Sequence, residues 1–289
     1  MVAGRASDDP AGETQLHHAG RGGAQTVTND RPNLARIYDA LLDGSDHYQT
    51  ERDLVERLVR VVPEAKTVAG ENRHWMLRTV RYLADKIGIL QFIDLGSGLP
   101  TAQNTHEVAQ KTNRDARVVY VDNDPVVQAH SRALLLDNDY THVAGSDLTR
   151  PEETLSDPVI AKHLDLGQPV GLIVSGVLHH LPDYDQARAV LRNYVDKLAP
   201  GSYVALTHLL EPEDSGETRD AVRAVTRTFR DTAIGVTPRA REQIEGFFDG
   251  LELVPPGLTY LHEWWPDGPR YTPLKPLNFA TLGGVARKN

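Results

Sequence analysis

Two stretches of the sequence combine glycine and aspartate in a pattern that suits a nucleoside-like ligand. An apolar run ends near Asp94 and continues through Gly96 and Gly98 into a helical pattern, and the next apolar run ends at Asp122. Glycine lets the backbone turn tightly where a β-carbon would intrude on a ligand. A carboxylate at the end of the neighbouring strand can accept hydrogen bonds from both ribose hydroxyls. The pattern therefore predicts an adenosine-binding site.

The residues after the second glycine favour S-adenosylmethionine over a dinucleotide. A pyrophosphate needs free N–H groups at the start of the next helix, and the dinucleotide fingerprint has a third glycine there. Here Thr101 takes that position, after Pro100, which has no N–H to donate. A buried carboxylate at Asp94 would repel a pyrophosphate and attract an ammonium group. We therefore expect an adenosyl ligand with a cationic amino-acid tail, with NAD(P) as the competing interpretation.

Histidines supply the candidate general bases. His179 and His180 follow the fourth apolar run, and His208 lies at the end of the fifth. Methyl transfer from a sulfonium chiefly requires alignment in a dry pocket, but an oxygen or ammonium nucleophile must also lose a proton. His179 and His180 are the candidate catalytic residues, and the alternatives for each are a structural hydrogen-bonding role and packing against the adenine. Adjacent histidines rarely converge on one ion, so we expect no metal site.

The elements that would position these residues are strands alternating with helices. Continuous apolar runs of this length indicate strands buried on both faces, and their alternation with helical patterns predicts a doubly wound parallel sheet. The runs span 89–95, 117–121, 140–144, 170–175 and 202–208. Farther along, the sequence predicts a helix at 221–229, a helix capped by Thr237 with Pro238 at its first position, and a strand pair near 251–261 and 279–286.

Helical patterns precede the first strand. Apolar residues at three- and four-residue spacings predict helices over about 32–44, 54–62 and 64–86. Residues 1–30 contain hardly any large apolar side chains, which predicts a disordered tail. We therefore divide the chain into a tail (1–30), an N-terminal helical cap (31–88) and a ligand-binding core (89–289).

Composition excludes several classes of function. The chain of 289 residues has no cysteine, so thiolate metal sites, disulfides and cysteine nucleophiles are absent. Its formal charge of −9 would repel phosphate backbones, which argues against a nucleic-acid partner. No apolar stretch approaches the roughly 20 residues that cross a bilayer, and the N-terminus does not resemble a signal peptide. We expect a cytoplasmic protein without a membrane partner.

The motifs resemble those of class I S-adenosylmethionine-dependent methyltransferases. The stretches FIDLGSGLPT at 92–101, VVYVDNDP at 118–125, HVAGSDL at 142–148 and VLHHLPD at 177–183 fit that class. More narrowly, ARIYDALLDGSDHY at 35–48 is similar to the N-terminal signature of the actinomycete S-adenosyl methyltransferase family, formerly of unknown function. The similarity extends from about residue 31 to the end of the chain.

This resemblance implies an α/β, Rossmann-like sheet of seven strands in the order 3-2-1-4-5-7-6, with the last strand antiparallel. It implies that Gly96 and Gly98 line the methionine end of the cofactor and that Asp122 holds the ribose. Asn123 would neighbour the adenine, and Asp147, after the third strand, would accept from the adenine amino group.

Two further regions receive roles from the resemblance. Ser175, at the end of the fourth strand, would face the methyl group. Its sequence context lacks the flanking glycines of a hydrolase nucleophile, which argues against a hydrolase. Asp46 and Tyr48 would belong to a cap that folds over the cofactor mouth. The alternative for these two residues is an ordinary turn after the first helix.

The sequence thus predicts a methyltransferase that uses S-adenosylmethionine to methylate a small molecule. The alternatives are an NAD(P)-dependent oxidoreductase on the same kind of sheet and a non-catalytic S-adenosylmethionine-binding protein. The sequence names neither the acceptor nor the attacked atom, and it leaves open a homodimer formed through the helices.

Overall fold

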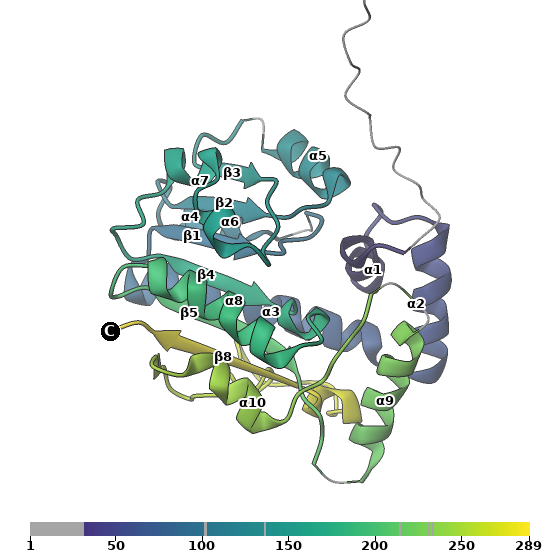
Figure 1. Ribbon diagram of the computed structural model, residues 1–289. Coiled ribbons are helices and arrows are strands. Elements are labelled where there is room, and N and C mark those ends of the chain that lie inside the picture. The colour runs from purple at the N-terminus through teal and green to yellow at the C-terminus, as the bar shows by residue number, and fades with distance from the viewer. Residues whose placement is uncertain (1–31, 101–102, 136, 214, 231, 233) are drawn as a thin grey trace, which may run out of the picture.

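The computed structural model describes residues 32–289 except 101–102, 136, 214, 231 and 233 (Figure 1). The tail prediction for residues 1–30 lies outside the described part of the chain. The description that follows concerns the remaining residues.

A central sheet organises the fold, and its strand order is β3-β2-β1-β4-β5-β8-β6, with β7 also paired to β8. The strands β1 to β5 are parallel to their neighbours, whereas β8 runs antiparallel to β5. The bounds are β1 Gln91–Leu95, β2 Arg117–Val121, β3 Thr141–Ala144, β4 Gly171–Ser175, β5 Tyr203–Leu209, β6 Glu252–Leu253, β7 Thr259–Tyr260 and β8 Thr281–Arg287. The predicted doubly wound architecture with an antiparallel C-terminal strand is confirmed.

The expected strand at 251–261 is divided into the short strands β6 and β7, which both pair with β8. Pro255 and Pro256 lie between them. Proline has no N–H to donate to a strand ladder, so pairing stops on either side. The described sheet therefore has eight strands where seven were expected.

Helices cover both faces of the sheet and one of its ends. They are α1 Leu34–Leu41, α2 Gln49–Val61, α3 Ala65–Tyr82 with the π-helical turn η1 Leu83–Ile87, α4 Thr105–Thr112, α5 Pro125–Leu134, α6 Pro151–Leu155, α7 Pro158–His163, η2 Leu178–His180, α8 Tyr184–Lys197, α9 Glu217–Arg230, α10 Arg241–Glu245, η3 Gly246–Phe248 and η4 Pro276–Phe279. None of the helices in the described ranges is long and apolar enough to cross a membrane.

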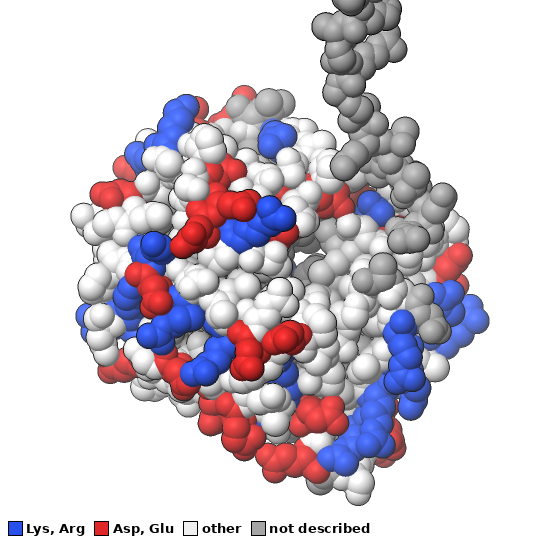
Figure 2. Space-filling model, in the orientation of Figure 1, with Lys and Arg blue, Asp and Glu red and all other residues white. Residues whose placement is uncertain are grey.

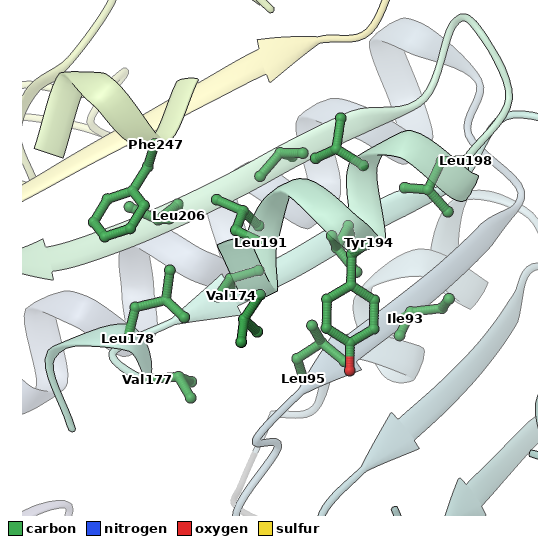
Figure 3. Close-up of a cluster of buried hydrophobic side chains, with 14 of the residues drawn as sticks. Ile93, Leu95, Val174, Val177, Leu178, Leu191, Tyr194, Leu198, Leu206 and Phe247 are labelled. Atoms are coloured by element: carbon green, nitrogen blue, oxygen red, sulfur yellow. The ribbon is translucent and has the colours of Figure 1, made fainter. Parts of the chain in front are cut away.

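Alternation along the strands divides the core into two layers. Ile93 and Leu95 of β1 face the layer that contains α8, and Figure 3 shows Leu191 and Tyr194 of α8 packed there. Phe92 faces the opposite layer, with side chains of α3 and α4. Asp94 is on the same side of β1 as Phe92 by this alternation, so its carboxylate is directed toward α3 and α4.

A third apolar cluster joins the N-terminal helices to later parts of the chain. Leu54 and Leu58 of α2 pack with Val222 and Phe229 of α9 and with Leu277 of η4. Figure 1 shows α1 and α2 on the side toward which the arrowheads of β1, β2 and β3 point, with α9 beside α2. Two distant segments of the sequence therefore cover the carboxyl end of the sheet. The boundaries of the cap and core stay a prediction.

The helix predicted to begin at Pro238 begins instead at Arg241, so that prediction was wrong. The Arg239 N–H donates to the Leu209 carbonyl at 3.1 Å, and the Arg239 carbonyl accepts from the N–H of Glu211 at 2.8 Å. Pairing with the end of β5 therefore keeps this segment extended. Thr237 donates its N–H to the His179 carbonyl at 2.8 Å and caps no helix.

Candidate functional site

A cavity of about 320 Å³ lies at the carboxyl ends of β1, β2, β4 and β5. Its walls come from the strand ends, from α1 and α3, and from α9 and η4. Parallel sheets of this type bind ligands at the carboxyl ends of their strands, beside the point where the strand order reverses. The cavity lies at that point, between β1 and β4.

The ends of β1 and β2 are held together by the glycine loop. The N–H of Gly98 donates to Oδ2 of Asp122 at 3.0 Å. The N–H of Gly96 donates to the carbonyl of Val121 at 2.8 Å. Gly96 has a φ of +64°, and a β-carbon there would lie 3.0 Å from Cγ2 of Val177. A glycine is therefore needed for both the backbone conformation and the close approach.

Asp122 links the two strand ends and faces the cavity with Asn123 and Asp124. Its Oδ1 accepts from the Asp124 N–H at 3.0 Å, while Oδ2 accepts from Gly98. Burial raises the pKa of Asp122, and these two backbone N–H groups act in the opposite direction. A carboxylate fixed in this way presents its remaining lone pairs to a ligand, which is what ribose hydroxyls require.

Asp94 and Arg73 place opposite charges at the same end of the cavity. Oδ2 of Asp94 accepts from the Thr105 hydroxyl at 2.6 Å. Burial raises the Asp94 pKa to about 6, although Thr105 and Arg73 favour the ionised form. The guanidinium of Arg73 donates to the carbonyl of Gln103 and to Oδ1 of Asn104, but its buried Nε has no partner among the described residues.

Arg73 was not among the predicted site residues. The sequence contains a signal for it, because a cation occurs next to the polar residue Asn72 within the helix predicted over 64–86. Only the fold shows that the helix runs past the end of β1. A half-buried cation whose buried Nε donor has no partner among the described residues is suited to bind an anionic group such as a carboxylate.

A polar network crosses the cavity floor from α1 to β5. The side-chain amide of Asn72 donates to the Tyr38 hydroxyl and to Oγ of Ser175, each at 3.1 Å. The Tyr38 hydroxyl donates to the Ala69 carbonyl at 3.1 Å. Oγ of Ser175 lies 3.3 Å from Oγ1 of Thr207, which accepts from the Gly176 N–H at 2.8 Å. The network fixes Ser175 in position at the end of β4.

The three candidate histidines differ in their surroundings. His179 and His180 line the cavity, and Nδ1 of His180 is 2.7 Å from the Gly235 carbonyl. Nδ1 of His179 is buried and has no hydrogen-bond partner in the described chain. Burial, with smaller effects from His180 and His208, lowers the His179 pKa well below its ordinary value, so the ring is neutral near pH 7. A neutral imidazole can accept a proton.

His208 does not line the cavity. Its Nδ1 lies 2.8 Å from the Leu209 carbonyl, and its Nε2 lies 2.7 Å from the Arg239 guanidinium. Arg239 also donates to the carbonyls of Leu178 and Leu181, at 3.1 and 2.6 Å. Since both of its ring nitrogens have partners, His208 has a structural role that holds the segment after β4 against β5.

Three predicted site residues lie outside the cavity lining. Oδ1 of Asp147 accepts from the N–H and hydroxyl of Thr149, at 2.9 and 2.7 Å. Asp46 has its Oδ2 3.6 Å from Nδ1 of His130, and the Tyr48 ring lies against the Arg36 guanidinium. Their contacts with the cofactor stay predictions.

The loop with Asp46 and Tyr48 is stabilised from within. Oδ2 of Asp39 accepts from the Asp46 N–H at 2.9 Å and lies 2.7 Å from Nδ1 of His47. The Tyr48 N–H donates to the Glu51 carboxylate at 3.0 Å, at the start of α2. These contacts account for the loop as a turn between helices, which was the alternative to a role at the cavity mouth.

The fold and this site define a Rossmann-like protein with an adenosyl-type ligand site, and comparison with known proteins identifies the family. The sequence pattern of the S-adenosyl methyltransferase family matches residues 21–289. The chain belongs to this family, and S-adenosylmethionine is its cofactor. No match was found among curated proteins.

Two solved structures are similar over most of their length. A "putative methyltransferase" from Thermobifida fusca YX is 42% identical, with a TM-score of 0.83, over 89% of this chain and 95% of that one. A duf574 family protein from Streptomyces avermitilis is 35% identical, with a TM-score of 0.85, over 90% of this chain and 99% of that one. Both support the family assignment, and neither description names an acceptor.

Proposed function

We propose that this protein methylates a small-molecule acceptor in the cavity, with S-adenosylmethionine bound across the ends of β1 and β2. The cofactor supplies, when bound, an electrophilic methyl group on a sulfonium. The observation that carries the proposal is one cavity in which Gly96, Asp122 and Arg73 share a lining with apolar residues of the N-terminal helices, α9 and η4. One part has the charges that the cofactor requires, and the rest has an apolar lining that an acceptor would contact.

The charges at the methionine end match the cofactor's amino-acid tail. We assign the carboxylate of Asp94 to the ammonium group and the guanidinium of Arg73 to the carboxylate. The unpartnered Nε of Arg73 supports this assignment, since buried polar atoms are normally hydrogen-bonded. Gly96 and Gly98 would let the ligand approach the backbone, and Asp122 would hold the ribose.

We assign the remaining predicted site residues to the adenine and to the methyl group. Asn123 would flank the adenine, and Asp147, which lies between the lining residues Ser146 and Leu148, would accept from the adenine amino group. Ser175 would face the methyl group, and His179 would take the proton released by the acceptor. His180 would support His179, since the two rings lie 4.4 Å apart.

The alternatives to this proposal have different support. An NAD(P)-dependent oxidoreductase is not supported, because the family and its cofactor are those of methyltransferases. A non-catalytic S-adenosylmethionine-binding protein has the same cofactor contacts and differs only in turnover. Release of S-adenosylhomocysteine in the presence of acceptor candidates distinguishes it. The cytoplasmic location, the absence of a nucleic-acid partner and a homodimer stay predictions from sequence.

Calorimetric titration tests the cofactor site. We expect S-adenosylmethionine to bind and NAD to fail. Asp122→Ala should weaken binding by about 3 kcal/mol, or roughly a hundredfold, because hydrogen bonds to a charged acceptor contribute about 1.5 to 3 kcal/mol each. Asp137→Ala removes the same charge from an exposed position before β3 and should leave the affinity unchanged. Equal affinities for the two variants would refute the ribose assignment.

A further inference from the structure

Charged side chains are confined to one end of the cavity. Its described lining contains four of them, namely Arg73, Asp94, Asp122 and Asp124. They come from the ends of β1 and β2 and from the part of α3 that faces β1. The remaining described lining has no Asp, Glu, Lys or Arg side chain.

The other end of the cavity is lined by the apolar cluster that joins the N-terminal helices to α9 and η4. Leu58 of α2, Val68 of α3 and Leu277 of η4 contribute to this wall, with Val225 and Phe229 from α9. We call this part of the cavity the acceptor chamber.

The orientation of α9 separates the chamber from a basic outer surface. Val225 lines the chamber, whereas Arg223, two residues earlier and about 200° around the helix, is exposed. Figure 2 shows basic side chains along the outer face of α9. The chamber itself therefore faces only the apolar side of this helix.

Polar groups meet the chamber at its border with the cofactor site. Ser175 and Thr207 already bond to each other and to neighbouring groups of the network. His179 differs, because its buried Nδ1 has no partner in the described residues. Its ring is held neutral by burial. The border thus offers hydrogen-bonding groups without a formal charge.

We propose that the acceptor is an uncharged, largely apolar small molecule that fills the chamber and presents one hydroxyl group beside Ser175 and His179. This inference rests on the proposed function, since it assigns the acceptor to the same cavity. A carboxylate or an ammonium group in the chamber would lose its hydration without gaining a counter-ion, which costs several kcal/mol. A neutral hydroxyl avoids that cost.

A hydroxyl acceptor also fits the site because His179 can take the proton that the hydroxyl loses. Its oxygen forms the bond to the methyl carbon, the pair of the broken carbon–sulfur bond stays on sulfur, and the hydroxyl proton passes to the His179 imidazole. The imidazolium then returns the proton to water after the product leaves. A depressed histidine pKa makes this ring a weak base, which favours an acidic hydroxyl such as a phenol over an alkyl alcohol.

Three naphthalene probes of similar size test the chamber by calorimetry on the protein saturated with S-adenosylhomocysteine. They are 2-naphthol, 2-naphthoate and 2-naphthylmethylammonium, which are neutral, anionic and cationic near neutral pH. We expect 2-naphthol to bind at least about tenfold more tightly than either ion, a difference of about 1.4 kcal/mol. Equal or tighter binding of an ion, or no binding of 2-naphthol, would overturn the inference.

Two variants of α9 with the same change in formal charge locate the binding. Val225→Asp should weaken 2-naphthol binding at least about tenfold and strengthen binding of the ammonium probe. Arg223→Gln, on the outer face, should change neither. Unaltered S-adenosylhomocysteine affinity in both variants will show that the cofactor site is intact. Wild-type affinity of Val225→Asp for 2-naphthol would contradict the chamber assignment, whereas failure of the wild type to bind S-adenosylhomocysteine would contradict the proposed function.

Discussion

At the residue scale, the proposed methionine end of the site combines two opposite charges held by different elements. Asp94 is directed to its position by strand alternation and is fixed by Thr105. Arg73 comes from α3 and keeps one buried donor without a partner in the described chain. Together they match a zwitterionic amino-acid tail, which an isolated carboxylate would not.

Replacing Arg73 tests this match. Arg73→Gln should weaken S-adenosylmethionine binding about tenfold to a hundredfold, because a charge-assisted hydrogen bond contributes about 1.5 to 3 kcal/mol. Binding of 5′-methylthioadenosine, which lacks the amino-acid tail, should not change. Calorimetric titration of both ligands measures the two effects.

Arg81→Gln is the matched control for that experiment. Arg81 lies two turns farther along α3, and its side chain is exposed beside Asp267. We expect it to bind both ligands like the wild type. If Arg73→Gln weakened both ligands by the same factor, the assignment of its guanidinium to the carboxylate would be wrong.

At the element scale, the approach of the cofactor proposed above depends on the turn between β1 and α4. Its backbone N–H groups bond to β2 through Val121 and Asp122. The turn is also packed against Val177, which follows β4. Three strand ends thus constrain one loop, and a β-carbon at Gly96 would press on the side chain of Val177 at 3.0 Å.

Gly96→Ala should therefore affect both stability and binding. A left-handed backbone conformation costs a non-glycine residue about 1 to 2 kcal/mol, and the contact with Val177 adds to this. We expect the free energy of unfolding in urea to fall by at least about 1 kcal/mol and the cofactor affinity to fall with it. Gly268→Ala has open space around its new methyl group and should be neutral. Equal stabilities for the two variants would show that the turn can adjust.

At the scale of the whole molecule, buried titratable groups link stability to pH. His208 has its pKa lowered to about 3, mainly by burial, whereas Asp94 has its pKa raised to about 6 by burial. Below pH 6.5 the unfolded chain binds a proton at His208 that the folded protein does not, so acidification removes stability down to about pH 3. Asp94 has the opposite effect on stability between pH 3.8, its pKa in the unfolded chain, and about pH 6, its pKa in the folded protein. In this range the folded protein binds a proton that the unfolded chain does not, so acidification adds stability.

A variant isolates the histidine contribution. As the pH falls below 6.5, the wild type should lose free energy of unfolding relative to His208→Gln by up to about 1.4 kcal/mol per pH unit. Asp94 is present in both proteins, so its contribution cancels in the comparison. Urea unfolding at a series of pH values measures the difference. Parallel pH profiles would mean that His208 is protonated in the folded protein.

The charge distribution of the whole molecule also differs from what composition alone suggests. The chain is acidic overall, yet Arg223, Arg227 and Arg230 lie on the exposed side of α9. Figure 2 shows basic side chains along α9, while acidic and basic side chains are interspersed over α8. The prediction that nucleic acid is not a partner therefore rests on net charge and not on a uniformly acidic surface.

The sequence by itself was sufficient for the sheet, the family and the cofactor. Buried parallel strands are continuous apolar runs, and the glycine loop and Asp122 are local features at strand ends, so both can be read along the chain. The helix that was predicted to begin at Pro238 shows where sequence signals for a single element are insufficient. The pairing of Arg239 with the end of β5 overrides a favourable helix cap.

Only the tertiary structure decided how distant segments complete the site. Arg73 meets Asp94 because α3 crosses the end of β1, and Val225 of α9 joins Leu58 of α2 in the acceptor chamber. Neither contact has a spacing rule in the sequence, since each depends on how whole helices pack around the sheet. The cofactor could therefore be predicted from short segments of the sequence. The proposed acceptor could not, because the chamber that would bind it forms only when distant helices pack together.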